Sequence, residues 1–297
     1  MENVEQEKEN LFNKVESEKV VDVLYEKLPV IAKGLIEKSQ DLNIPENKGF
    51  FENPDDPMEH EPNWHQWGII THTAKFTEAY KAETPEFLRQ AGLAEFVNEK
   101  MAEQIDGLTK NRLLSISIPL HDLGKFTERK LKTGPDGTIS HSFKGHEKAS
   151  GRIIRQPEFI QMLRDQELTA NQIEYIAHCA ERHYELGLLR DAAKRSQTGF
   201  NFALIESELF LKSAQEIISA NLDIAAEIGI MYLSDSLAKI SLRVKAESDE
   251  EIITQRESVT KIIADLGLSP RLVNATLQMP VNMRLVKRYL EICRATE

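Results

Sequence analysis

Apolar positions recur at helical spacing along most of the chain, and polar segments separate these runs. Residues 4–40 combine helix-forming Glu and Lys with a periodic set of Val, Leu and Ile, so we predict a helix there. The stretch 43–63 carries four prolines among Asn and Asp, which favour turns, and we expect a loop. The helical pattern resumes near Trp67.

The middle of the chain is harder to interpret. Pro85 suits an early helical turn and predicts a new helix over EFLRQAGLAEFVNEKMAEQI. In NRLLSISIPLHDLGK the apolar residues alternate as in a strand, and Pro119 would kink a helix by removing a donor. We predict a buried helix, because the neighbouring segments are helical and no partner strand is evident. The turn residues of KTGPDGTIS predict a loop.

The second half of the chain reads as consecutive helices. They are predicted at about 145–156, 158–165, 169–186, 203–220, 221–246, 249–266, 269–278 and 281–294. The fold class expected is therefore all-α, a multi-helix bundle with peripheral helices at both ends.

Composition and charge limit the function classes. The chain has 297 residues, of which 41% are hydrophobic and 29% charged, so a buried core is expected. Two cysteines, no apolar run long enough for a bilayer and an acidic start without a signal-like segment predict a cytoplasmic protein without a membrane partner. A net charge of −11 argues against broad nucleic-acid binding, but not against a small phosphorylated substrate held by metal ions.

Six polar residues occupy positions that the pattern predicts to face inward. A buried carboxylate is costly unless it is paired or bound to a cation, and Asp235 is the single carboxylate on an apolar helical stripe. The full set is His72, His121, Asp122, His146, His183 and Asp235. Imidazoles and carboxylates suit Fe, Mn, Zn, Co or Ni, and Mg is less favoured. We interpret His60, His65, His141 and His178 as loop or surface residues.

The order of these residues, H72…H121-D122…H146…H183…D235, resembles the HD superfamily of metal-dependent phosphohydrolases. The local strings WGIITHTAKF, LHDLGKF, FKGHEKAS, AERHYEL and LSDSLAKI carry the resemblance, and HEPNWHQWGIITHT is similar to HD domains attached to bacterial nucleotidyltransferases. The resemblance covers about residues 60–245. It implies an HD-like metal-binding core there, N-terminal helices and a Pro-rich loop packed on it at 1–59, and a C-terminal helical extension at 246–297.

The resemblance also implies roles for individual residues. One metal would be held by His72, His121, Asp122 and Asp235, and Asp122 would bridge to a second metal held also by His146 and His183. Asp122 and Lys125 would serve catalysis, with Lys125 meeting a substrate phosphate. Lys144 and Arg182, which flank proposed ligands, and His65, close to the first one, are further candidates for substrate binding. The implied reaction is hydrolysis of a nucleotide or other phosphate ester by a metal-bound hydroxide.

Two other functions stay open at this point. The same ordered ligand set resembles HD-related diiron oxygenases, which cleave C–C or C–P bonds with O₂. The chain could also be a non-catalytic sensor that binds a nucleotide or metal. The sequence leaves the substrate, the number of metals and the oligomeric state open. The turn-rich stretches 43–66 and 126–144 are the expected rim of the pocket.

Overall fold

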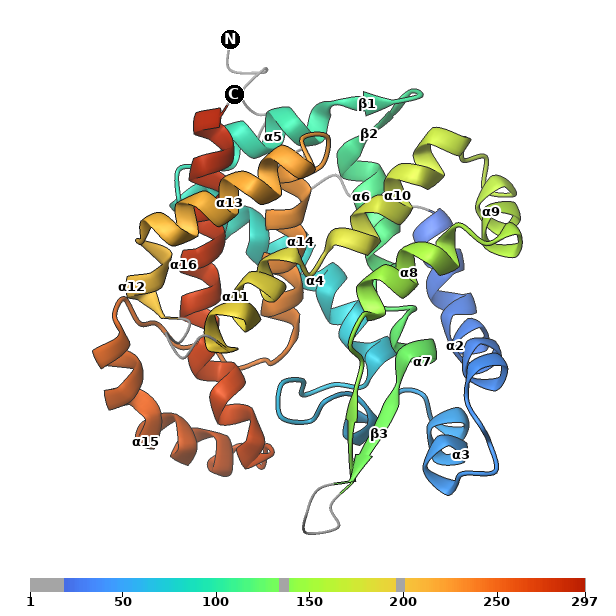
Figure 1. Ribbon diagram of the computed structural model, residues 1–297, viewed down its shortest axis with the longest axis horizontal. Coiled ribbons are helices and arrows are strands. Elements are labelled where there is room, and N and C mark those ends of the chain that lie inside the picture. Colours follow the sequence, from blue (N-terminus) through green and yellow to red (C-terminus); the bar gives the residue numbers. More distant parts are fainter. Residues whose placement is uncertain (1–18, 134–138, 196–200, 297) are drawn as a thin grey trace. The chain divides into compact units, whose positions relative to one another are not determined.

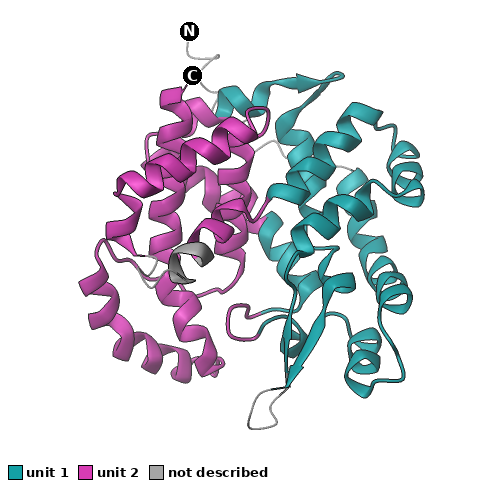
Figure 2. Ribbon diagram, viewed as in Figure 1, with its two compact units in different colours: residues 1–61, 67–77, 98–182 teal, residues 62–66, 78–97, 183–297 magenta. Residues whose placement is uncertain are grey.

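The computed structural model describes residues 19–133, 139–195 and 201–296, and helices dominate this part of the chain (Figure 1). The predicted all-α class and the multi-helix architecture are confirmed. The chain forms two compact units (Figure 2). Unit 1 comprises residues 1–61, 67–77 and 98–182, and unit 2 comprises residues 62–66, 78–97 and 183–297. The predicted division at residues 60 and 246 stays a prediction.

Unit 1 is built mainly from helices that pack around the segment with the strand-like pattern. Its elements are α2 (Lys19–Ser39), α3 (Pro45–Glu52), η1 (Pro57–Glu59), the start of α4 (Ile69–Gln90), the end of α5 (Ala94–Ala102), α6 (Lys110–Ser117), η2 (Ile118–Leu120), α7 (Lys125–Glu128), α8 (His146–Ile154), α9 (Pro157–Arg164) and α10 (Ala170–Arg182). Helix α10 packs on α8 and α6, and α2 packs on α7 (Figure 1).

The predicted buried helix around residues 111–125 is confirmed as α6 and η2. Pro119 lies in the first turn of η2, where a missing N–H costs no helical hydrogen bond. All residues of α6 except Arg112 are buried, and so are the three residues of η2. A helix buried on all sides has no polar face, which is why the segment shows no clear helical period.

Two short antiparallel hairpins, both in unit 1, were not predicted. Strands β1 (Gln104–Ile105) and β2 (Leu108–Thr109) pair across Asp106 and Gly107, whose φ angles of 50° and 87° fit the tight Asp-Gly hairpin turn. Strands β3 (Lys130–Thr133) and β4 (Ile139–Ser142) flank the segment predicted as a loop, of which residues 134–138 lie outside the described part. Such short strands carry too few residues for an alternating pattern to be recognised.

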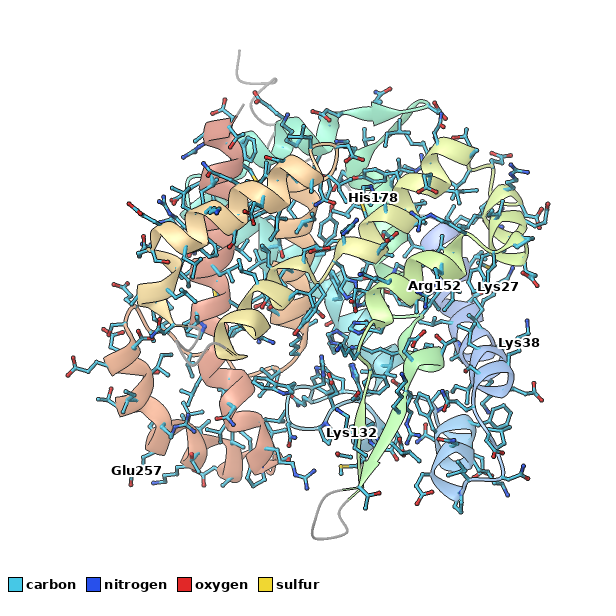
Figure 3. The ribbon with its side chains drawn as sticks, viewed as in Figure 1. Lys27, Lys38, Lys132, Arg152, His178 and Glu257 are labelled. Atoms are coloured by element: carbon cyan, nitrogen blue, oxygen red, sulfur yellow. The ribbon has the colours of Figure 1, made fainter. Side chains whose placement is uncertain are left out.

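Unit 2 is built around a long C-terminal helix. Its elements are the rest of α4 and α5, α11 (Glu185–Arg195), α12 (Phe202–Ile205), α13 (Glu208–Ala220), α14 (Ala225–Ala238), α15 (Asp249–Asp265), η3 (Pro270–Leu272) and α16 (Val273–Thr296). Helix α16 contacts α12, α13, α14 and α15, and α14 is buried almost throughout. Figure 3 shows charged side chains on exposed positions of both units, such as Lys27 and Lys38 on α2 and Glu257 on α15.

Proline positions account for several wrong helix boundaries. Pro85 lies inside α4, and Pro280 lies inside α16, which is continuous where two helices were predicted. Tertiary packing offsets the donor that each proline removes, and Pro280 is itself buried. Conversely, Pro45 and Pro57 each occupy the first turn of a helix, α3 and η1, within the predicted loop.

The other boundaries differ in smaller ways. The predicted helix 169–186 ends at Arg182, and the helix predicted at 221–246 ends at Ala238. After Ala238 the carbonyl of Lys239 accepts a hydrogen bond from the Gln66 N–H at 2.8 Å, and the Gln66 side chain accepts one from the Ser241 N–H at 2.9 Å. Residues 4–18 of the first predicted helix lie outside the described residues.

In the described residues no single helix has the length and hydropathy needed to cross a membrane. Helices α13 and α14 reach these values only together, and the chain bends by 116° between them.

Candidate metal centre

The dipeptide His121-Asp122 follows η2 directly and lies at the centre of a buried polar cluster in unit 1. His121 is fully buried and Asp122 is 2% exposed. The Nδ1–H of His121 donates to the carbonyl of Ile118 at 2.7 Å, because a carbonyl oxygen can only accept. The Nε2 atom of His121 therefore faces Asp122, at 3.2 Å from Oδ2.

His146 approaches the other carboxylate oxygen of Asp122. It is the first residue of α8 and follows Gly145, whose φ of 87° favours glycine. Its Nδ1–H donates to the carbonyl of Phe143 at 2.8 Å, and its Nε2 lies 3.3 Å from Asp122 Oδ1. Both imidazoles thus present Nε2 to Asp122 and are oriented by main-chain carbonyls, the arrangement usual for histidine ligands of metals.

Gly124 allows α7 and α8 to approach closely enough for this arrangement. A Cβ atom at position 124 would lie 2.0 Å from the carbonyl oxygen of His146. The Gly124 N–H donates to the Ser150 hydroxyl of α8 at 2.9 Å. Glycine in the string HDLGK is therefore a packing requirement.

His72 completes a group of three potential ligands. It lies on α4, is fully buried, and places Nε2 4.0 Å from Asp122 Oδ2. One donor atom from each of His72, His121 and Asp122 lies within 4.8 Å of the other two.

The start of α4 is held in place by its neighbours in unit 1. The Thr71 N–H donates to Asp55 Oδ1 at 2.8 Å, and the Thr71 hydroxyl donates to Asp55 Oδ2 at 2.6 Å. On α2, the Tyr25 hydroxyl donates to the Thr73 carbonyl at 3.0 Å. These contacts fix the helical turn that carries His72.

Lys125 and His60 form a buried pair beside this group. The Lys125 ammonium lies 2.8 Å from Asp122 Oδ2 and donates to His60 Nε2 at 2.8 Å. The Nδ1–H of His60 donates to the Trp67 carbonyl at 2.9 Å. Lys125 is 3% exposed and His60 is fully buried. His60 lies in a loop, as one part of our interpretation has it, but it does not lie at the surface. The Pro-rich stretch before α4 thus contributes the buried His60 to the cluster.

The electrostatics of the cluster fix two charge states at neutral pH. Burial raises the pKa of Asp122, but the neighbouring imidazole of His121 and ammonium of Lys125 outweigh burial and hold this pKa well below its usual value of 3.8. Burial, with the charge of Lys125, lowers the pKa of His60 well below 6.5. A carboxylate at Asp122 and a neutral imidazole at His60 follow.

The donors of unit 1 fit a divalent transition metal. Nitrogen and carboxylate donors bind such a metal at about 2.0–2.2 Å, which places neighbouring donors roughly 3–3.5 Å apart. The distances from Asp122 to His121 and His146, 3.2 and 3.3 Å, fall in that range. The two histidines face different oxygens of the Asp122 carboxylate. These buried residues can therefore hold a metal ion.

Three further predicted site residues lie in unit 2. His65, His183 and Asp235 belong to unit 2 and are buried, which makes the surface interpretation of His65 wrong. Asp235 on α14 pairs with Lys239 one turn later, at 2.8 Å. Participation of these three residues in the site stays a prediction.

The two basic candidates flanking the ligands are in unit 1, where Lys144 is exposed and Arg182 is half-buried at the end of α10. His141 and His178 are half-buried. His141 Nε2 lies 2.8 Å from the carbonyl of Met58, and its Nδ1 lies 3.3 Å from the Arg129 guanidinium, so it takes part in the packing of the β3–β4 hairpin. Our interpretation of His141 and His178 as loop or surface residues is therefore wrong in part, since both are half-buried and lie on β4 and α10.

No protein-family model matches the chain, and neither the curated proteins nor the solved structures contain a match to it.

Proposed function

We propose that the protein is a metal-dependent phosphohydrolase of the HD type that acts on a nucleotide or another phosphate ester. One observation carries the proposal: both oxygens of the buried Asp122 carboxylate face histidine Nε2 atoms, and main-chain carbonyls fix these imidazoles. A structural carboxylate would be satisfied by a single cation such as Lys125. Three imidazoles around it are better explained by a metal site.

Bound divalent cations would lower the pKa of a water ligand and stabilise negative charge on the phosphoryl group. Among the protein groups, Asp122 would supply the carboxylate, and His72, His121 and His146 would supply the imidazoles. In our proposal His183 and Asp235 complete the set, as the resemblance implies. Three or more nitrogen donors favour Fe, Mn, Zn, Co or Ni over Mg.

Lys125 is the proposed phosphate ligand. Its ammonium is held between Asp122 and His60 at 2.8 Å from each, so it is positioned before a substrate arrives. A neutral His60 can accept this hydrogen bond without competing for the phosphate. His60 is thus a positioning residue for Lys125. Lys144, Arg182 and His65 are weaker candidates for substrate contacts.

The proposal is tested on the full-length chain by metal analysis together with assays on nucleoside mono- and triphosphates, cyclic dinucleotides and short oligonucleotides. We expect bound transition metal and hydrolysis of at least one class. The isosteric variant Asp122→Asn should lose both, while Asp265→Asn, an exposed carboxamide substitution on α15, should lose neither. Hydrolysis that survives unchanged in Asp122→Asn contradicts the proposal.

Two results would support the other functions instead. Turnover that requires O₂ and iron and stops under anaerobic conditions would identify the diiron oxygenase. Tight metal or nucleotide binding without turnover across the panel would identify a sensor.

A further inference from the structure

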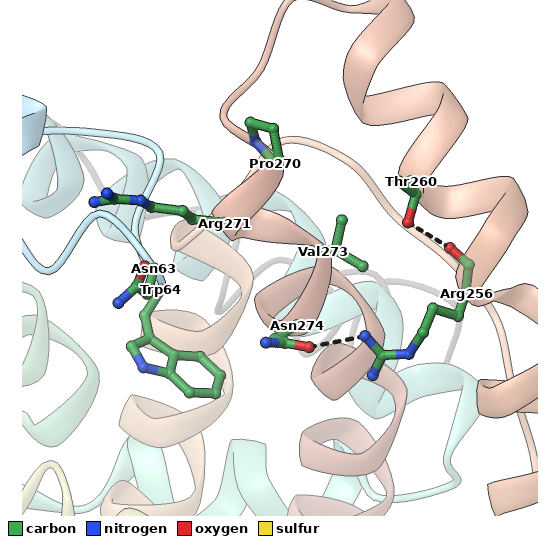
Figure 4. A pocket seen from close by; sticks show the side chains of 8 residues that line it. All are labelled: Asn63, Trp64, Arg256, Thr260, Pro270, Arg271, Val273 and Asn274. Atoms are coloured by element: carbon green, nitrogen blue, oxygen red, sulfur yellow. Dashed lines mark hydrogen bonds between the residues drawn. The ribbon is translucent and has the colours of Figure 1, made fainter.

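A polar cleft lies within unit 2. This cleft of about 570 Å³ is formed by α15, the segment around η3, the start of α16 and residues 62–66 (Figure 4). Its lining combines the guanidinium groups of Arg256 and Arg271 with the indole of Trp64 and the amides of Asn63 and Asn274, and it includes no Asp or Glu. None of these residues belongs to the proposed metal centre.

The two arginines make the cleft electropositive in an acidic protein. The chain carries 48 acidic against 37 basic residues, yet in the described part neither guanidinium has a carboxylate oxygen within 4.0 Å. The Arg256 guanidinium donates to the amide oxygen of Asn274 at 3.1 Å. Val273 and Asn274 are the first residues of α16, where the helix dipole adds positive potential. An anion is the ligand that this arrangement favours.

The indole of Trp64 gives the cleft a fixed flat wall. The guanidinium carbon of Arg190 lies 5.6 Å from the centre of the Trp64 ring. Arg190 is only 6% exposed and donates to the Tyr184 hydroxyl at 2.8 Å, so it holds the ring from a defined position. Figure 4 shows Asn274 between Trp64 and the Arg256 guanidinium. A planar group stacked on the indole would therefore lie next to the positive charge.

We propose that this cleft binds a small phosphorylated ligand with a planar ring, of the nucleotide class. The phosphate groups are held by Arg256, the ring lies against Trp64, and Arg271 adds positive charge on the other side of the indole (Figure 4). The cleft volume is within the usual range of small-molecule sites. The proposal does not depend on the metal chemistry, and it assigns a second nucleotide site to the chain.

Titration calorimetry and tryptophan fluorescence with ADP as the probe test the proposal. Ribose 5-phosphate supplies the phosphate without the ring, and adenosine supplies the ring without the phosphate. We expect saturable ADP binding that is stronger than either, with a fluorescence change that disappears in Trp64→Phe. Equal affinity for ribose 5-phosphate and ADP would overturn the ring contact, and no saturable ADP binding at millimolar concentration would overturn the site.

Substitutions of the cleft residues test whether ADP binds in the cleft. Arg256→Gln should weaken ADP binding at least about tenfold, because it removes a charge-assisted contact. Arg271→Gln removes positive charge from the cleft but no such contact, so it should weaken binding less. Asn274→Asp keeps the shape but supplies an internal carboxylate to Arg256, so it should weaken binding similarly to Arg256→Gln. Arg284→Gln on α16 removes the same charge from an exposed pair with Glu206 and should have little effect. Equal affinity in the cleft variants and in Arg284→Gln would overturn the proposal.

One further variant distinguishes ADP binding in the cleft from ADP binding at the metal centre. Asp122→Asn should retain ADP binding, and the cleft substitutions should weaken it equally in the wild-type and Asp122→Asn backgrounds. Loss of all ADP binding in Asp122→Asn alone would assign the nucleotide to the metal centre and overturn the second site, whatever hydrolytic activity the chain has.

Discussion

The α-carbon of Gly124 lies against the main chain of His146, so close that a methyl group at position 124 would come within 2.0 Å of the His146 carbonyl oxygen. The contact joins the segment that carries His121 and Asp122 to the helix that begins with His146. The distance between two proposed ligand segments therefore depends on the absence of a side chain.

Gly124→Ala should separate α7 from α8. Backbone atoms cannot give way as a flexible side chain does, so we expect a loss of about 1–3 kcal/mol in the free energy of unfolding and weaker metal binding. Chemical denaturation and metal analysis measure the two effects. Gly34→Ala on α2 is the matched control, since a Cβ there would meet nothing within 4 Å. It should stabilise the protein by up to about 1 kcal/mol through helix propensity. Normal stability and metal content in Gly124→Ala would refute the close contact.

The Asp122 carboxylate should make stability depend on pH in the acid range. Its folded-state pKa is lowered, so its contribution is fully present above the unfolded-state pKa of about 3.9 and is lost as the pH falls through the lower folded-state pKa. The difference in unfolding free energy between wild type and Asp122→Asn should therefore be constant near neutral pH and shrink below about pH 4. Denaturation of both proteins across this range measures it. If the difference in unfolding free energy between the two proteins grew on acidification, the pKa of Asp122 would be raised by folding and not lowered.

Substitution of Lys125 should lower the catalytic activity without removing the metal. Lys125→Met removes the proposed phosphate contact but no metal ligand, so we expect about a 100-fold loss in kcat/KM with metal content retained. His60→Gln keeps an acceptor for Lys125 and should retain more activity than His60→Phe, with the metal content of both near that of wild type. Steady-state kinetics and metal analysis distinguish these outcomes. Equal activity of the two His60 variants would exclude its positioning role.

Arg129 should be the most sensitive charged residue in the packing of unit 1. Its buried guanidinium donates to Asn47 Oδ1 at 2.8 Å and pairs with Glu59, and it lies 4.7 Å from the centre of the Phe50 ring. Removing one partner of a buried pair costs about 3–5 kcal/mol, so Arg129→Met should lower the unfolding free energy by that amount. Arg129→Lys should rescue little, because an ammonium cannot reproduce the two-sided contact.

The control for Arg129 is another arginine–glutamate pair of the same unit. Arg152 pairs with Glu128 at 3.0 Å, but its side chain is 64% exposed. Arg152→Met should therefore cost less than about 1 kcal/mol. Similar losses in Arg129→Met and Arg152→Met would contradict the packing role of Arg129.

Helical periodicity was informative where the site residues lie on helices or end them. A polar residue on an apolar stripe must be buried once the helix packs, and on that basis the sequence predicts burial of His72 and the His121-Asp122 pair, as observed. His60 was missed because it lies in a Pro-rich stretch without periodicity. It makes contacts with residues distant in sequence, such as the hydrogen bond from Lys125, which no local pattern reveals.

Prolines misled the prediction for a related reason. Pro280 lies within a continuous helix because α16 is packed by several neighbours, and local propensity contains no information on those neighbours. The cleft in unit 2 also could not be predicted from the sequence. Trp64 and Arg256 are far apart in the sequence, and neither interrupts a pattern.

The imidazoles of His121, His146 and His60 donate to main-chain oxygens of Ile118, Phe143 and Trp67. Every amino acid carries that carbonyl, so exchanging any of the three acceptor residues alters local packing but leaves the acceptor in place. The path of the backbone therefore determines which ring nitrogen of each histidine carries the hydrogen. Side chains around the centre can be substituted without changing which ring nitrogen faces inward.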